Sequence, residues 1–198
     1  SALEQTYPNI EVVIVNDGSS QYNELLHPFL QHPKVVYCNQ SNGGTASALN
    51  TGIRAAKGEY VAWLSSDDRF YPWKVARQMA YMIPRHARIS FSDYDLIDES
   101  GAITQHGAGL KFPTYPEFCR TFLIGNPING CTVIAQKKLL QNLGLFRTAL
   151  PYTHDYDLWF RVIVRGIDFH YVPESLIQYR EHNAMGTKKH LPIILQET

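Results

Sequence analysis

Blocks of apolar residues separated by polar turns run through the first half of the chain. Three apolar runs predict buried strands, at residues 10–15, 34–38 and 61–64. Stretches with the spacing of amphipathic helices lie between and after them, at about residues 22–30, 42–56 and 72–82. Strands and helices alternating at this spacing predict an α/β fold with a mostly parallel, Rossmann-like sheet and helices on both faces.

The second half is less regular. The turn Glu99–Gly101 between two short strand-like runs predicts a small antiparallel hairpin. Residues 155–165 predict a strong helix that ends at Gly166. Weaker patterns predict further helices and strands at residues 115–124, 131–135, 136–143, 169–172 and 176–179. We expect a single domain over residues 1–198, made of two halves at residues 1–110 and 111–198.

Composition limits the class of protein. The chain has 198 residues, of which 44% are hydrophobic, and this suits one globular domain with a sizeable core. Eighteen basic and eighteen acidic residues cancel, so charge gives no reason to expect nucleic acid or an anionic membrane as the main partner. No apolar run is long enough to cross a bilayer, and the start shows no secretory signal pattern. Three widely spaced cysteines predict reduced thiols. We therefore expect a cytoplasmic protein, and leave peripheral contact with the inner face of a membrane open.

Two adjacent carboxylates, Asp67 and Asp68, follow the third predicted strand. In open α/β sheets ligands bind beyond the carboxyl ends of strands, and hard divalent cations take oxygen ligands. The pair therefore suggests a metal site. Two structural interpretations compete with it: Asp67 caps the helix that begins near Pro72, or both residues simply form a polar loop.

Three other polar sites occupy loops after strands or the starts of helices. Asp17 follows the first strand, where an Asx turn is a sufficient structural explanation. Asn42-Gly43-Gly44 precedes a helix whose free backbone N–H groups could meet a phosphate, although a simple turn is the alternative. Asp155 begins the strong helix, where it also suits the helix dipole, and His154 precedes it. Together the four sites suggest transfer chemistry on a nucleotide diphosphate, and they leave sugar transfer and nucleotidyl transfer open.

The order of four motifs along the chain resembles that of the family 2 glycosyltransferases, which have the GT-A fold. The motifs are Val-Asn-Asp-Gly-Ser (15–19), Asn-Gly-Gly-Thr-Ala-Ser-Ala-Leu-Asn-Thr-Gly-Ile (42–53), Ala-Lys-Gly-Glu-Tyr-Val-Ala-Trp-Leu-Ser-Ser-Asp-Asp (56–68) and Asp-Tyr-Asp-Leu-Trp-Phe-Arg (155–161). Tyr-Arg-Glu-His at residues 179–182 is similar to a further element of that family. The likeness covers nearly the whole chain.

The resemblance implies an inverting, metal-assisted enzyme that uses Mn²⁺ or Mg²⁺. It would move a hexosyl or N-acetylhexosaminyl group from a nucleoside-diphosphate sugar, with UDP favoured, to a glycan or lipid-linked acceptor in cell-surface or extracellular glycan synthesis. The glutamine-arginine-tryptophan signature of processive synthases is absent, so a single addition is favoured. Homo-oligomerisation stays open. The alternative from another class is a non-catalytic nucleotide-sugar-binding or assembly protein of the same fold.

By the same likeness, the first half would bind the nucleotide sugar and the second half the acceptor. The residues implied at the nucleotide are Asp17, Asn42, Gly43 and Asp67. The implied metal ligands are Asp68 and His182. Asp155 would be the general base that takes the proton of the acceptor hydroxyl. The residues implied at the acceptor are Asn126, Gly130 and His154.

The chain departs from the family pattern in places. Ser65 stands where an acid often precedes the Asp pair, and His154 stands where a glutamate commonly precedes the base. Family members also begin with a valine-rich central strand, followed by the helix that residues 1–6 would end. Without that strand its neighbours would keep unpaired backbone groups, so we predict a shortened chain with a gap in the sheet, or another segment that fills it.

Overall fold

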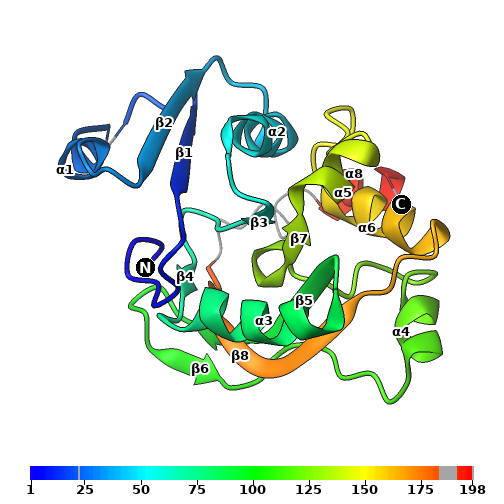
Figure 1. Cartoon of the computed structure of the whole chain (residues 1–198). Coiled ribbons are helices and arrows are strands. Elements are labelled where there is room, and N and C mark those ends of the chain that lie inside the picture. The colour runs from blue at the N-terminus through cyan, green and yellow to red at the C-terminus, as the bar shows by residue number, and fades with distance from the viewer. Residues whose placement is uncertain (22, 183–190, 198) are drawn as a thin grey trace.

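The computed structural model describes residues 1–21, 23–182 and 191–197. Its sheet is in two parts (Figure 1). In the smaller part, β1 (Val12–Asp17) and β2 (Val35–Gln40) pair in parallel. A 3-10 turn (Asn23–Leu26) and the short helix α1 (His27–Leu30) connect them, and neither contains a buried residue. This stretch was predicted as one amphipathic helix, but it lacks a buried face.

The larger part of the sheet has the strand order β3-β7-β5-β8-β4, and β6 pairs with β5. Its strands are β3 (Tyr60–Ala62), β4 (Arg69–Phe70), β5 (Ile89–Ile97), β6 (Ile103–Gln105), β7 (Ile134–Gln136) and β8 (His170–Arg180). β5 and β8 pair in parallel, whereas β7 is antiparallel to both β3 and β5. The α/β class is therefore confirmed, with mixed rather than mostly parallel pairing, because β7 enters between β3 and β5.

Two details of the strands refine the sequence analysis. The predicted hairpin is confirmed as β5 and β6, closed by hydrogen bonds from Asp98 N to Ala102 O and from Gly101 N to Asp98 O, each 3.0 Å long. The two short strands expected at residues 169–172 and 176–179 form one strand, β8. Irregularities in its register with β5 absorb the proline and polar residues between the two apolar runs.

The two parts of the sheet do not join. Among the described strands, β1 pairs only with β2, and β3 pairs only with β7, so one edge of each lacks a partner strand. The split agrees with the predicted gap. Residues 1–6, expected to end a helix, instead form turns, and the Gln5 side chain ties them to the start of α3 (Lys74–Met82) by bonds to Tyr71 O and from Val75 N.

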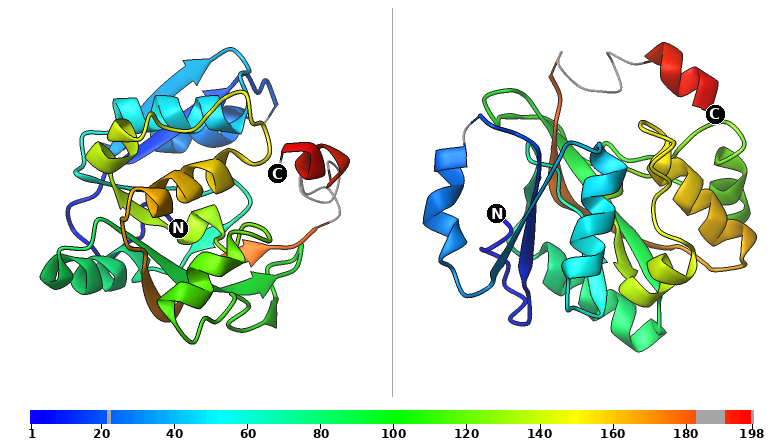
Figure 2. Two further views of the ribbon diagram at one scale, coloured as in Figure 1. Left: turned by 90° about the vertical axis from the view of Figure 1, so that its right-hand side faces the viewer. Right: turned by 90° about the horizontal axis from the view of Figure 1, so that it is seen from above.

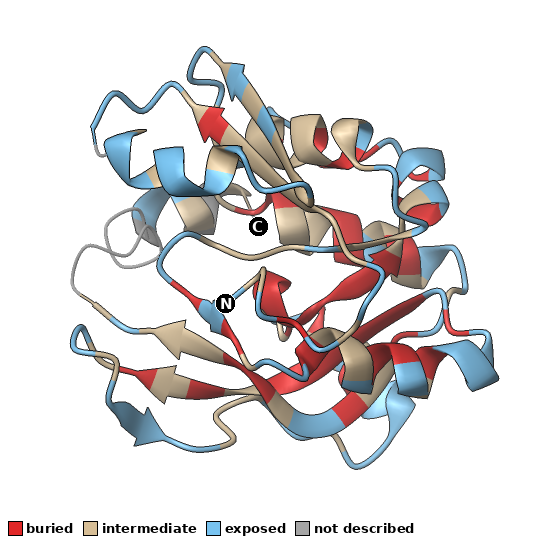
Figure 3. Cartoon of the chain, turned by 60° about the vertical axis from the view of Figure 1, so that its left-hand side comes forward, coloured by how far each residue is buried: buried red, intermediate tan, exposed pale blue. Residues whose placement is uncertain are grey.

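Four helices contribute to the main core with the larger sheet, and the first of them also packs against β1 and β2. They are α2 (Thr45–Ala55), α4 (Tyr115–Thr121), α5 (Lys137–Asn142) and α6 (His154–Val164). The most deeply buried α6 residues, Leu158, Trp159 and Val162, lie on one face of that helix, as its spacing predicts. Buried residues concentrate where these helices meet the strands (Figure 3). Figure 2 shows α1 at one end of the molecule, with α4, α6 and α8 (Leu191–Glu197) at the other.

One buried amide ties α2 to the segment that precedes α6. The Asn50 side chain is 5% exposed; its Nδ2 donates to Phe146 O at 2.8 Å, and its Oδ1 accepts from Phe146 N at 3.0 Å. One side chain thus forms hydrogen bonds with the N–H and the C=O of Phe146, which belong to no helix or strand.

We predict that Asn50→Ala lowers the free energy of unfolding by about 2–4 kcal/mol, because it leaves both Phe146 groups buried without a partner. Urea denaturation followed by circular dichroism measures the loss. Asn142→Ala, at an exposed amide on α5, is the matched control and should change stability by less than about 0.5 kcal/mol. Equal effects of the two substitutions would contradict the role given to Asn50.

Candidate functional site

The Asp67–Asp68 pair lies in the turn between β3 and β4. β3 ends at Ala62, earlier than the predicted strand, so Asp67 and Asp68 follow the end of β3 by five and six residues and directly precede β4. The Asp68 side chain is buried, and its Oδ1 accepts from Arg180 N at 2.9 Å. Its Oδ2 makes no hydrogen bond with any described residue. Burial raises the pKa of Asp68 above its ordinary value, against the lowering effect of the Arg180 N–H.

Arg180, the last residue of β8, holds this turn in place. Its Nε donates to Asp67 O at 2.9 Å, and its Nη1 donates to Asp98 O at 2.6 Å and to Glu99 O at 3.0 Å. The Asp67 carboxylate remains partly exposed and lies 3.1 Å from His182 Nε2. The structure thus brings together three of the predicted residues, Asp67, Asp68 and His182. The motif at residues 179–182 pointed to Arg180, although its contacts with both turns were not predicted.

Asp155 lies in the first turn of α6 and is partly buried. Its Oδ2 accepts from Asn126 Nδ2 at 2.9 Å, and its Oδ1 accepts from Tyr156 N at 2.7 Å. Burial raises the pKa of this carboxyl group, while the charge of His154 and the two hydrogen bonds act in the opposite direction. Asn126, assigned to the acceptor by resemblance, therefore contacts the candidate base directly.

Hydrogen bonds to Glu197, a residue distant in sequence, hold the segment that leads into α6. Glu197 Oε2 accepts from Tyr152 N at 3.2 Å, from Thr153 N at 2.9 Å and from Thr153 Oγ1 at 2.7 Å. A carboxylate suits the partial positive charge at the start of a helix. No sequence spacing links Glu197 to residues 44 positions earlier, so this contact was missed.

His154 and Gly130 lie beneath the surface, around the ring of Trp63. The His154 ring is 5.9 Å from that of Trp63 and 5.5 Å from that of Phe146, and His154 is only 5% exposed. A Cβ on Gly130 would stand 2.2 Å from the Trp63 ring. Both were expected to face an acceptor; the structure instead places them in aromatic packing, and neither lies on the open surface.

Asp17 bonds to the start of α2. Its Oδ1 accepts from Gly43 N at 2.9 Å and from Gln40 Nε2 at 2.7 Å, and its Oδ2 accepts from Gly44 N at 2.8 Å. The backbone amides expected to meet a phosphate are thus bonded to Asp17 in this structure. Gly44, with φ of +82°, is the N-cap of α2. The carboxylate supplies the negative charge that the helix N-terminus favours.

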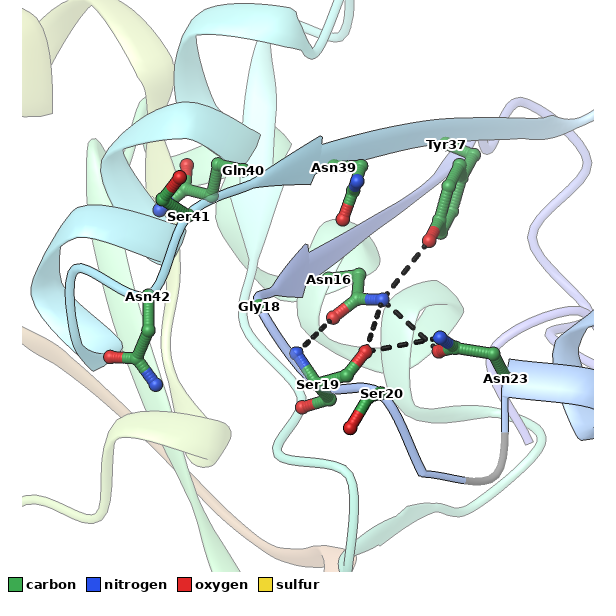
Figure 4. A pocket seen from close by; sticks show the side chains of 10 residues that line it. All are labelled: Asn16, Gly18, Ser19, Ser20, Asn23, Tyr37, Asn39, Gln40, Ser41 and Asn42. Atoms are coloured by element: carbon green, nitrogen blue, oxygen red, sulfur yellow. Dashed lines mark hydrogen bonds between the residues drawn. The ribbon is translucent and has the colours of Figure 1, made fainter.

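An open hollow of about 720 Å³ lies beyond the carboxyl ends of β1 and β2 (Figure 4). Its lining contains amide and hydroxyl side chains and one aromatic ring, and no charged side chain: Asn16, Gly18, Ser19, Ser20, Asn23, Tyr37, Asn39, Gln40, Ser41 and Asn42. Asn16 organises it by donating to Ser19 O, Asn23 Oδ1 and Tyr37 Oη. Of the four residues expected at the nucleotide, only Asn42 lines this hollow. A lining without charged side chains suits a neutral polar group.

The predicted residues therefore fall into three groups. Asp17, Asn42 and Gly43 lie at the ends of β1 and β2. Asp67, Asp68 and His182 surround the end of β8. Asn126 and Asp155 lie at the start of α6. Trp63 joins the second group to the third, because it precedes the Asp pair by a few residues and its ring packs on His154, the neighbour of Asp155.

Comparison with known proteins defines the class. The family model for glycosyl transferase family 2 matches residues 1–142, and the chain belongs to this family. An uncharacterized glycosyltransferase of Rickettsia felis is 38% identical over 200 residues, which cover 96% of this chain and 32% of that protein. The chain thus spans about a third of that relative's length. The UDP-Glc:alpha-D-GlcNAc-diphosphoundecaprenol beta-1,3-glucosyltransferase WfaP of Escherichia coli is 30% identical over 171 residues, or 84% of this chain and 64% of WfaP.

The fold is that of GT-A glycosyltransferases. The crystal structure of S. aureus TarS 1-349 in complex with UDP-GlcNAc superposes with a TM-score of 0.72 at 17% identity. The match covers 92% of this chain and 53% of the TarS chain, and at this identity it shows the fold alone. None of the helices in the described part of the chain is long and apolar enough to cross a membrane.

We predict that Gly130→Ala lowers the free energy of unfolding by about 1–3 kcal/mol, because the new methyl group overlaps the Trp63 ring and forces the packing to shift. Gly125→Ala is the matched control, since a Cβ there meets nothing within 4 Å. Chemical denaturation of both variants tests the prediction. A Gly130→Ala variant as stable as the control would show that Trp63 is not held by this contact.

Proposed function

We propose that this chain transfers a sugar from a nucleoside-diphosphate sugar to an acceptor hydroxyl, with inversion at the anomeric carbon. The observation that carries the proposal is the placement of two separate carboxylate groups, Asp67–Asp68 and Asp155, linked through Trp63 and His154. One group suits the charged donor and the other suits the neutral acceptor.

The donor side offers a carboxylate oxygen with no internal partner. Buried polar atoms are nearly always hydrogen-bonded, and Asp68 Oδ2 has no hydrogen-bond acceptor role toward any described residue, so it suits contact with an external group. In the described residues no three His, Cys, Asp or Glu side chains converge to hold a metal by themselves. We propose that Asp68 would hold Mg²⁺ or Mn²⁺, with Asp67 and His182 beside it, because such ions often use one or two carboxylates together with substrate phosphates and water. A divalent cation there would supply positive charge for the departing nucleoside diphosphate.

The acceptor side supplies the base. In the proposed step the acceptor oxygen forms a bond with the anomeric carbon while the bond to the donor phosphate breaks, and the hydroxyl proton passes to Asp155. The raised pKa of Asp155 makes it a stronger base than an exposed aspartate. Asn126 orients the carboxylate by donating to Oδ2.

The relatives support a substrate class. TarS has been crystallised with UDP and with UDP-GlcNAc, and the name of WfaP specifies UDP-Glc and a diphosphoundecaprenol acceptor. We therefore propose a UDP-hexose or UDP-N-acetylhexosamine donor and a glycan or lipid-linked acceptor, extended by single additions in cell-surface glycan synthesis. We place this activity in the cytoplasm, at the inner face of the membrane.

A second candidate function is binding of a nucleotide sugar without catalysis. Two observations favour it. Asp17 accepts hydrogen bonds from the backbone N–H groups at the start of α2, and β1 and β2 form a sheet that is separate from the larger one. This candidate predicts UDP affinity without any turnover.

We predict that Asp155→Asn lowers kcat about 10²- to 10⁴-fold, the usual contribution of a general base, while UDP affinity stays within twofold. A radiolabelled-sugar transfer assay and isothermal titration with UDP measure the two quantities. Transfer that survives the substitution would remove Asp155 from the role of base. Equal loss of UDP affinity would indicate a collapsed site.

We also predict a shift in the pH profile of Asn126→Ala. Asp155 acts as a base only when ionised, so the rate falls on the acid side of its raised pKa. Removing the Asn126 amide removes a hydrogen bond that favours the ionised form, so the pKa rises and the acid limb moves to higher pH. The control is Asn142→Ala, and an unchanged acid limb in Asn126→Ala would contradict the assignment.

A third prediction concerns the donor side. Asp68→Asn keeps an oxygen that can accept from Arg180 N and removes the charge. We expect UDP binding in the presence of Mn²⁺ to weaken at least tenfold, while the weaker binding measured without metal changes little. Asp168→Asn is the control, because Asp168 is exposed and precedes β8 at the end opposite Arg180. An unchanged metal dependence would remove Asp68 as a ligand.

A further inference from the structure

Exposed apolar side chains gather where α4 ends and along the outer face of α6. Leu123 is 78% exposed, Ile124 88%, Phe160 42% and Val164 63%. We call these four residues the α4–α6 patch. Large apolar groups exposed together, rather than singly, mark surfaces that meet another apolar phase.

The members of the patch belong to one surface. Tyr156 Oη donates to Phe122 O, and the two rings stack with centroids 6.1 Å apart, so the end of α4 packs against the first turns of α6. Phe160 and Val164 follow Tyr156 at intervals of four residues and therefore lie on the same helix face. Figures 1 and 2 both show α4 alongside α6.

Two arginines flank the patch, and two exposed acids, Glu117 and Asp168, each lie three residues from one of them in sequence. Arg120 precedes Leu123 by about one turn, and Arg165 directly follows Val164; both are exposed. Neither arginine forms an ion pair with any residue that the structure describes. The nearest acid on α6, Asp157, is instead neutralised by Arg147 and Arg161. Apolar side chains bordered by unpaired cations match the interface of a bilayer with anionic lipids.

We propose that the α4–α6 patch seats the protein on an anionic bilayer surface, with the four apolar side chains in the interface and the two arginines at lipid headgroups. The patch adjoins the candidate base, since Asn126 follows Ile124 by two residues and Asp155 precedes Tyr156 by one. This inference rests on the proposed function only for its purpose, which is to bring Asp155 to an acceptor carried by a membrane lipid.

The test is sedimentation of the 198-residue chain with vesicles of phosphatidylcholine alone, or of phosphatidylcholine mixed equally with phosphatidylglycerol. We expect binding to the mixed vesicles and at least tenfold weaker binding to the neutral ones. Leu123→Ser with Ile124→Ser should weaken binding to mixed vesicles at least tenfold, because two apolar side chains no longer enter the interface. Arg120→Gln with Arg165→Gln should weaken it about fivefold per arginine removed.

The matched control is Leu25→Ser with Phe29→Ser, which removes two exposed apolar side chains, 63% and 48% exposed, at the opposite end of the molecule. This variant should bind vesicles like the wild type. Wild-type protein that ignores both kinds of vesicle, or a control that loses binding equally, would overturn the proposal. So would a wild-type dimer that ignores vesicles and is dissociated by the Leu123 and Ile124 substitutions, since the patch would then join two copies.

UDP binding by each variant separates this proposal from the proposed function. Patch variants should bind UDP like the wild type, and circular dichroism should show native melting. Vesicle binding without UDP binding would leave the bilayer surface supported and the transferase proposal refuted. UDP binding without vesicle binding would leave the transferase proposal supported and the bilayer surface refuted.

Discussion

The contacts of Arg180 are the constraint on which the turn with Asp67 and Asp68 depends. β8 ends at this residue, and its backbone N–H fixes one oxygen of the buried Asp68 carboxylate. Its guanidinium group donates hydrogen bonds to carbonyl oxygens of two separate turns, the one that carries Asp67 and the one that joins β5 to β6. An arginine suits this task because its planar group donates in several fixed directions while remaining charged. The Asp pair can therefore be held rigidly although it lies beyond the end of its own short strand.

Aromatic packing extends this constraint to the start of α6, where Asp155 lies. Trp63 leads into the Asp pair, covers Gly130, and meets Phe146 and His154 edge-on or tilted. Since His154 directly precedes Asp155, the spacing between the two carboxylate groups is set by packed rings rather than by a flexible loop. Close packing of this kind transmits small displacements, so substitutions around Trp63 should affect both sides of the site together.

The parts of the fold that local pattern determines could be predicted from the sequence. The apolar runs of β1, β2 and β3, the β5–β6 hairpin and the helix α6 followed from periodicity and turn residues. The insertion of β7 between β3 and β5 could not be predicted, because a short apolar strand carries no information about its neighbours. The same limit applied to the site. Asp155 lies in the first turn of the predicted helix and Asp67 and Asp68 follow β3 in the chain, whereas the bond of Asp17 to α2, the burial of His154 and the contact of Glu197 arise from residues that are distant in sequence.

The central claim is that Asp67–Asp68 and Asp155 serve a single in-line displacement. The most direct measurement is proton NMR of the first product formed from a UDP-α-linked sugar, which reports the configuration of the new glycosidic bond. A base on the acceptor side and a leaving group on the donor side predict attack from opposite faces of the anomeric carbon, and therefore a β-linked product. An α-linked product would contradict this account, because it would require two displacements or a different arrangement of the same carboxylates.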